Sequence, residues 1–211
     1  MTDDNQFADN IYLAPTPAGA FYAVSSPAKE PLRDLLLALL NQKETPRPVI
    51  EQLVDWSGSG NARSMMSLLY QAQSLSWIEG LDQPVLLPES GFGATAEILL
   101  RSLSASGKAL LVDNMGCAVI RNGFDAETAE ILSALSVDMF SIQDRHEKRL
   151  EKHFDLATAG WGALDSSGSS RLGTWPLYIG NIRLLLVVLG EPRFNCPEFT
   201  LLIWNLVRRY S

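Results

Sequence analysis

The stretch closest to a chemical signature is a glycine run, Gly91-Phe92-Gly93-Ala94-Thr95-Ala96. It follows a short apolar segment, residues 85–87, and opens a helical pattern, as the glycine-rich turn of a dinucleotide-binding site does. In such a site the glycines let a pyrophosphate approach a helix N-terminus, and an acid about 20 residues further on binds a ribose hydroxyl. Asp113 occupies the corresponding place. The run makes a nucleotide-binding enzyme one alternative function.

Two features count against this alternative. Pro88, Glu89 and Ser90 separate the apolar segment from the first glycine. Asp113 leads straight into a tight hairpin, whereas a dinucleotide site needs a crossover to a parallel strand. The other interpretation of residues 88–93 is a linker between two domains.

Metal-binding and nucleophilic residues are sparse. His146 and His153 are seven residues apart and would share one face of a helix, but two imidazoles are too few for a closed metal site unless Asp144 or Glu147 completes it. Histidines on a solvated helix end are the simpler interpretation. The two cysteines, Cys117 and Cys196, are expected to be reduced and packed. We therefore predict no catalytic residue, no cofactor and no metal.

Composition indicates a globular protein with room for two small domains, because 46% of its 211 residues are hydrophobic and 19% are charged. The longest apolar run, residues 184–189, is too short to cross a bilayer, and the acidic start is unlike a secretory signal, so a cytoplasmic location is expected. The net charge of −7 argues against nucleic acid and membrane partners. Residues 1–90 hold most of it, with five Lys or Arg against eleven Asp or Glu.

The N-terminal half alternates short apolar runs with helical patterns. We expect strands at 12–14 and 21–24, three helices, and a hairpin that joins 77–78 to 85–87. This order of elements, over about residues 11–88, resembles a winged helix-turn-helix domain.

In the winged-helix family the third helix reads DNA, which here is residues 61–74. The resemblance implies that Arg63, Gln71 and Gln73 would contact DNA, in a dimeric transcription regulator. Arg63 is the only cation in that helix, although phosphate contacts normally need several. The other interpretation is a helical module for protein contacts.

The C-terminal half predicts a sheet with helices. Strands at 109–113 and 118–121 flank a turn that contains Gly116, and a second hairpin joins 174–179 to 182–189. A further strand is expected within 154–161, followed by a loop. The whole chain is thus predicted to be α+β.

The long helix that follows Asp125 has two distinctive sides. An apolar stripe at helical spacing is predicted to face the core, and a neighbouring side of small residues would let a second helix approach closely. Those small residues either pair with another subunit or lie beneath the domain's own backbone. The stripe is Leu132, Leu135, Met139 and Ile142; the predicted dimer interface is Ala129, Ser133, Ser136 and Phe140.

The end of this helix is highly charged. We expect it to fade into a solvated loop, although its cations could contribute to a docking face. These cations are Arg145, Lys148, Arg149 and Lys152.

Three runs carry a second resemblance: ALLVDNMGCAVIRNGF, DAETAEILSAL and WPLYIGNIRLLLVVLG. With them, residues 91–211 resemble the Roadblock family of dynein light-chain and bacterial Roadblock-like domains. The connection over 152–172 departs from the family in being long and rich in Ser and Gly. The resemblance implies a five-stranded antiparallel sheet, a homodimer made through the long helix and an edge strand, and a role as scaffold or regulator, often of small Ras-like GTPases.

The leading hypothesis is therefore a non-enzymatic cytoplasmic regulator. A winged-helix-like domain, residues 1–88, would be joined to a Roadblock-like domain, residues 91–211, that forms a homodimer and docks a protein partner such as a small GTPase.

Overall fold

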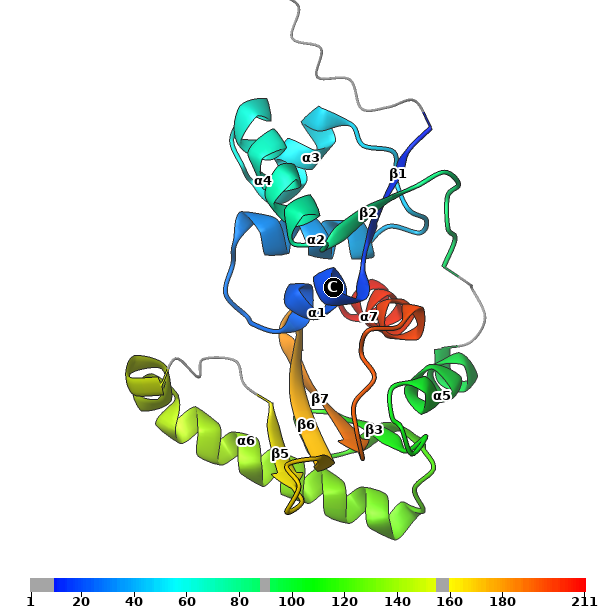
Figure 1. Ribbon diagram of the computed structural model, residues 1–211, viewed down its shortest axis with the longest axis vertical. Helices are drawn as coiled ribbons and strands as arrows, with labels where there is room; N and C mark the ends of the chain where they lie inside the picture. Colours follow the sequence, from blue (N-terminus) through cyan, green and yellow to red (C-terminus); the bar gives the residue numbers. More distant parts are fainter. Residues whose placement is uncertain (1–9, 88–91, 155–159) are drawn as a thin grey trace, which may run out of the picture.

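The computed structural model describes residues 10–87, 92–154 and 160–211 (Figure 1). Residues 88–91 of the linker predicted over 88–93, and most of the strand expected within 154–161, lie outside these ranges, and the last two linker residues begin a helix. In chain order the elements are β1 (Tyr12–Pro15), α1 (Pro17–Val24), α2 (Pro31–Leu40), α3 (Ile50–Ser57), α4 (Ala62–Ser74), β2 (Ile78–Leu81), α5 (Phe92–Ser102), β3 (Ala109–Val112), β4 (Ala118–Asn122), α6 (Ala126–Phe154), β5 (Trp161–Leu164), β6 (Ser170–Ile179), β7 (Ile182–Leu189) and α7 (Pro197–Tyr210).

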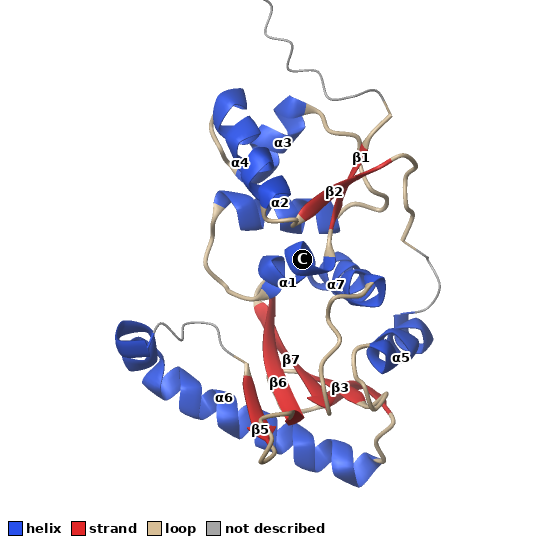
Figure 2. Ribbon diagram, in the orientation of Figure 1, coloured by secondary structure: helices blue, strands red, loops and turns tan. Residues whose placement is uncertain are grey.

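Five strands form one antiparallel sheet in the order β4-β3-β7-β6-β5. Because alternate residues of a strand point to opposite faces, β3 supplies two cores. Leu110 and Val112 pack under α6, whereas Ala109 and Leu111 belong to the core under α5 and α7. Figure 2 shows α6 on one side of the sheet and α5 and α7 on the other. The predicted α+β class and the five-stranded antiparallel sheet are confirmed.

In the N-terminal part, two predicted strand pairs are wrong. Residues 21–24, expected as a strand, end helix α1, which Thr16 caps by accepting a hydrogen bond from the N–H of Gly19 at 3.2 Å. The strand expected at 77–78 pairs with β1 as part of β2 and forms no hairpin with 85–87. Leu86 makes an isolated bridge to Glu44 instead. The winged-helix resemblance therefore loses its predicted hairpin.

Helix α7, the last element, lies in the middle of the molecule (Figure 1). It packs against α1 and α2 as well as against α5 and the sheet. Phe199 and Leu202 of α7 belong to the same buried cluster as Leu35 of α2 and Met65 of α4. The two parts predicted as separate domains thus share one continuous core.

The region after α6 also differs from the prediction. Helix α6 runs through the charged segment to Phe154 and does not fade into a loop. The expected loop over 162–170 contains strand β5 and a tight turn to β6. In that turn the carboxylate of Asp165 accepts from the hydroxyl of Ser167 and from the N–H groups of Ser167 and Ser169, and these hydrogen bonds lower the pKa of Asp165.

Candidate functional site

The predicted dimer interface on α6 faces the protein's own sheet. Its four side chains are almost fully buried in a single subunit, so none is free to meet a second helix. The exposed fractions are 1% for Ala129, 1% for Ser133, 2% for Ser136 and 0% for Phe140. The structure thus corrects this interface and matches the other interpretation, in which the small residues lie beneath the domain's own backbone.

Small size and local hydrogen bonds explain why this side is buried. The hydroxyls of Ser133 and Ser136 donate to the carbonyls of Ala129 and Leu132, both at 2.7 Å, so burying them leaves no donor unpaired. Ser136 also lies 3.3 Å from the hydroxyl of Thr174 on β6. Small side chains therefore let α6 lie close on the sheet.

The opposite side of α6 exposes three large apolar side chains, with the exposed Asp138 between the second and the third. Ile131, Leu135 and Ile142 have exposed fractions of 60%, 43% and 54%. Their spacing of four and seven residues aligns them along one side of the helix. Leu135 and Ile142 belong to the stripe predicted to face the core, so the prediction is wrong for these two residues. Leu132 and Met139 of the same stripe are half-buried, and Leu132 packs against the core under α6. A row of large apolar side chains in water is typical of a contact surface.

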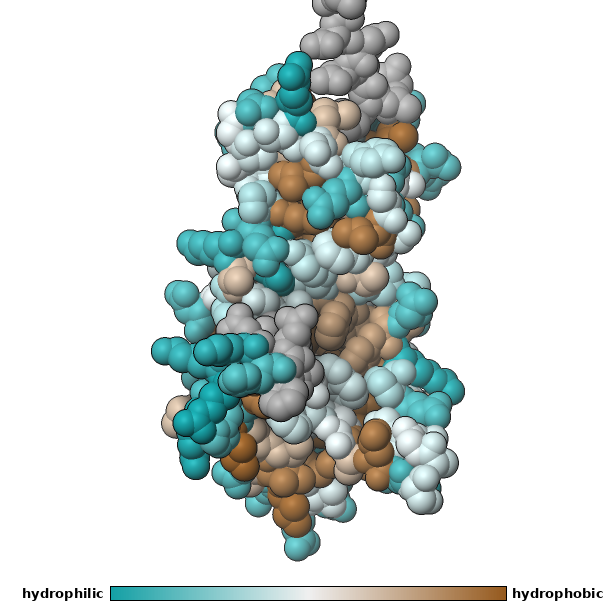
Figure 3. All heavy atoms as spheres, turned by 60° about the vertical axis from the view of Figure 1, so that its left-hand side comes forward, coloured by the Kyte–Doolittle hydropathy of each residue, from teal (hydrophilic) through white to brown (hydrophobic). Residues whose placement is uncertain are grey.

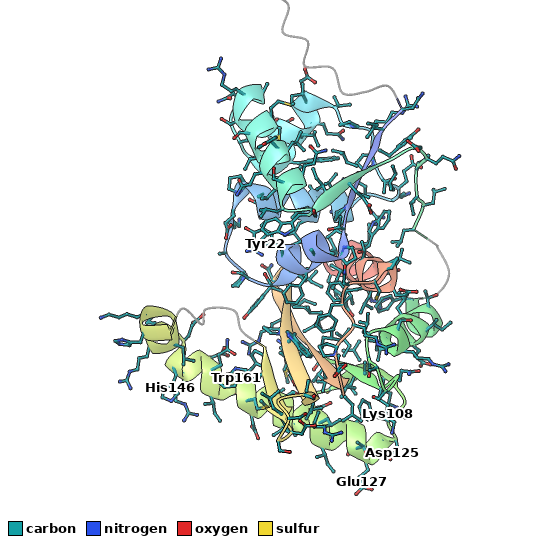
Figure 4. The ribbon with its side chains drawn as sticks, viewed as in Figure 1. Tyr22, Lys108, Asp125, Glu127, His146 and Trp161 are labelled. Carbon is teal, nitrogen blue, oxygen red and sulfur yellow. The ribbon has the colours of Figure 1, made fainter. Side chains whose placement is uncertain are left out.

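Strand β5 lies beside this helix at the edge of the sheet. It pairs with β6 only, so its other edge presents unpaired backbone N–H and C=O groups. Trp161 and Leu164 are 36% and 66% exposed. The indole N–H of Trp161 donates to the side-chain oxygen of Gln143, which fixes β5 to α6 (Figure 4).

We call Ile131, Leu135, Ile142, Trp161 and Leu164 the α6–β5 surface. In Figure 3 brown, hydrophobic atoms gather at the lower end of the molecule, next to teal, hydrophilic atoms. Sequence reasoning placed Trp161 at the end of an expected strand and Leu164 in the loop after it, so it did not identify them as neighbours on one exposed strand. The signal that was available is Asp165 followed by Gly168, a turn composition between two possible strands.

The charged end of α6 remains exposed. Its cations, Arg145, Lys148, Arg149 and Lys152, all face solvent. Just before them Asp144 forms an ion pair with Arg183 of β7 at 2.8 Å, and this hydrogen bond raises the pKa of Arg183. The pair ties the middle of α6 to the sheet.

The possible metal ligands do not come together. His146 and His153 are exposed on α6, His146 pointing away from the sheet in Figure 4, and Asp144 is engaged by Arg183. Over residues 10–87, 92–154 and 160–211, no three His, Cys, Asp or Glu side chains are grouped to hold a metal. Cys117 is exposed at the β3–β4 turn, which corrects the expectation that it is packed.

The described part of the glycine run and its surroundings lack the geometry of a dinucleotide site. Gly91 lies outside the described residues, and a side chain at Gly93 would meet nothing within 4 Å. The Asp113 carboxylate is already used, because it accepts from the N–H groups of Met115 and Cys117 at 2.9 and 2.8 Å. Strand β3 is antiparallel to both its neighbours, so the required parallel crossover is absent from it.

The predicted DNA-contacting residues do not share one face. Arg63, Gln71 and Gln73 are all exposed on α4. At about 100° per residue, Gln71 and Gln73 point about 160° apart around the helix. DNA binding stays a prediction, with one cation in the helix to support it.

In comparisons with known proteins, no family model, no curated protein and no solved structure matches this chain. Within the described parts of the chain, no helix has both the length and the apolar composition needed to span a bilayer.

Proposed function

We propose that this protein is a non-enzymatic cytoplasmic regulator or scaffold that forms a homodimer through the α6–β5 surface. The dimer would dock a protein partner, for which a small Ras-like GTPase is the leading candidate because of the Roadblock resemblance. A five-stranded antiparallel sheet with helices packed on it supports this choice, because the resemblance implies such a sheet.

The observation that carries the proposal is the adjacency of an exposed apolar helix side and a free strand edge. A twofold axis at β5 would pair it with β5 of a second copy and join the two sheets into one. The same axis would bring the two α6 helices together, so that each Leu135 leaves water. Such self-complementary contacts are what a twofold dimer requires.

The dimer would also create the docking face. Two sheets in register place two sets of helices on each side of one continuous layer, a larger surface than one subunit offers. The cations at the end of α6 would lie at the rim of this layer, where charge steers an acidic partner and adds little affinity.

Cysteine crosslinking tests the β5 contact. In a Cys117→Ser, Cys196→Ser background, a cysteine placed at Ala163 or Leu164 should form a disulfide-linked dimer under mild oxidation, because paired strands bring such positions within about 5.5 Å between Cα atoms. Ile98→Cys is the matched control, since Ile98 is 68% exposed on α5, across the sheet. Equal crosslinking from Ile98→Cys, or none from β5, would contradict the proposal.

A further inference from the structure

A polar hollow lies on the side of the sheet away from α6. It measures about 620 Å³ and lies where the end of α5, the loop into β3, the end of β4 and the loop after β7 meet. Ligand pockets typically span about 300–1,000 Å³. None of its residues belongs to the α6–β5 surface, so it requires an explanation of its own.

Three cations line the hollow and no acid does. Arg101, Lys108 and Arg193 come from three different segments and all are exposed. Among the residues that the structure describes, none of the three forms an ion pair. The chain has a net charge of −7, so a hollow lined by three unpaired cations is opposite in sign to the protein as a whole. Like charges held together without a counter-ion attract an anion.

The nearest acids along the chain are outside the hollow or occupied. The Asp125 carboxylate accepts from the N–H of Thr128 at 2.7 Å at the start of α6, and Asp125 is not among the residues that line the hollow. Glu191 is not among the lining residues, and its backbone carbonyl accepts from Ala105 at 2.9 Å. The positive charge of the hollow is therefore not neutralised from within its lining.

The floor of the hollow is fixed by hydrogen bonds. The hydroxyls of Ser104 and Ser106 donate to the carbonyl of Leu189 at 2.6 and 2.8 Å, which attaches the loop before β3 to the end of β7. The side chain of Asn122 donates to the carbonyl of Gly107 at 2.5 Å, which attaches the same loop to β4. A loop held at both ends keeps the backbone next to Lys108 in place without a ligand, which lowers the cost of binding.

A glycine also makes room for one of the cations. Gly123 has a φ of +77°, and a Cβ there would lie 2.7 Å from Cγ of Lys108. The lysine stem passes over the position where a side chain would stand. The missing side chain at Gly123 therefore leaves room for the stem of Lys108, which lines the hollow.

We propose that this hollow binds the phosphate group of a small soluble molecule. Two guanidinium groups can each donate two parallel hydrogen bonds to phosphate oxygens, and an ammonium adds a point charge. A phosphate dianion matches three cations better than a single carboxylate does. The volume exceeds that of phosphate alone, which leaves space for the group that carries it.

Calorimetric titration of the full chain at fixed ionic strength tests the proposal. Pyrophosphate and adenosine monophosphate should bind saturably, and acetate should not. The double variant Arg101→Gln, Arg193→Gln should weaken binding by at least about tenfold, because charge-assisted hydrogen bonds are lost. Arg63→Gln, an exposed cation on α4, is the matched control and should bind as the parent does.

Several results would overturn the proposal. One is that neither pyrophosphate nor adenosine monophosphate gives saturable heat. Another is that acetate binds with the same affinity, and a third is that Arg63→Gln weakens binding as much as the double variant does. Binding only to vesicles that carry phosphatidic acid would also overturn it, because a lipid surface and not a soluble molecule would then be the source of the phosphate. Should the double variant fail to fold, Lys108→Gln and the amide chemical shifts of Gly107 and Gly123 under pyrophosphate decide the matter, with unchanged shifts counting against the site.

Discussion

The indole N–H of Trp204, on the last helix, donates to the backbone carbonyl of Gln42 at 2.7 Å, across 162 residues of sequence. Arg208, one turn further along α7, donates to the carbonyl of Asn41 at the same distance. Helix α2 ends at Leu40, so side chains of α7 bind carbonyls that follow its C-terminus, where helices leave such groups unpaired. Side chains of the last helix therefore provide hydrogen-bond donors for backbone carbonyls of the N-terminal part.

This contact predicts that the molecule unfolds as one unit. Trp204→Ala should lower the free energy of unfolding by about 3–5 kcal/mol, because a large buried side chain and its hydrogen bond are both lost. Trp204→Phe, the milder control, should cost about 1–2 kcal/mol. Urea unfolding followed by far-UV circular dichroism and by fluorescence should give coincident transitions. Two separate transitions would show that the two parts fold independently.

The surroundings of two glycines give a second prediction about stability. A Cβ at Gly19 in α1 would lie 2.0 Å from the backbone oxygen of Trp77, whereas one at Gly93 in α5 would meet nothing within 4 Å. Gly19→Ala should therefore destabilise the protein by about 1–3 kcal/mol, because the backbone must move. Gly93→Ala should be neutral or stabilise by up to about 1 kcal/mol, because alanine favours the helix. Thermal unfolding measures both, and equal effects would contradict the close approach of Gly19 to Trp77.

Alkaline pH provides a third prediction. Burial, the hydrogen bond that its hydroxyl donates to Glu30, and the Glu30 charge raise the pKa of Tyr22 from 10.0 to about 12. Because the pKa is higher in the folded state, Tyr22 contributes stability that is fully present below pH 10. This contribution is lost as the pH rises through 12. Tyr22→Phe should keep the ring stacked on Trp77 and should lose less stability over this interval than the parent does.

The control for this experiment is Tyr70→Phe, because Tyr70 is 75% exposed. Its unfolding free energy should fall with pH as the parent's does. If Tyr22→Phe also followed the parent curve between pH 9 and 12, the Tyr22 hydroxyl would not be protected in the folded state.

The hairpins of the C-terminal half could be predicted because their turns and strands agree. Gly116 and Gly180 both have positive φ, at 81° and 55°, and lie between apolar runs that form β3–β4 and β6–β7. Local sequence and long-range pairing demand the same structure there. The pairing of β3 with β7, which joins these hairpins into one sheet, is between segments far apart in sequence and could not be seen from the local pattern.

Helix α6 could not be oriented from its sequence, for a physical reason. Hydrophobic periodicity assumes that large apolar side chains are buried and small polar ones are exposed. Ser133 and Ser136 satisfy their hydroxyls on their own helix, so they can be buried at little cost, and the sheet supplies most of the core through Leu110 and Leu185. Ile131 and Leu135 are then left on the outside. Periodicity identified two sides of the helix but not which one faces the sheet.

Helix α1 shows another limit. The run at 21–24 has the apolar character of a strand, but Thr16 and Pro17 five residues earlier are a helix start. Burial against α7, far away in sequence, favours the helix. That contact could not be seen from the local pattern.

The central claim is that the exposed side of α6 pairs with a second copy, and sedimentation equilibrium of the full chain measures this directly. We predict a mass of twice 23.2 kDa at micromolar concentration for the parent and for Ile98→Asp, and of 23.2 kDa for Leu135→Asp, because a buried charge at the paired helices would separate them. A parent chain that stays at 23.2 kDa at the highest attainable concentration, or a dimer that Leu135→Asp leaves intact, would contradict the account.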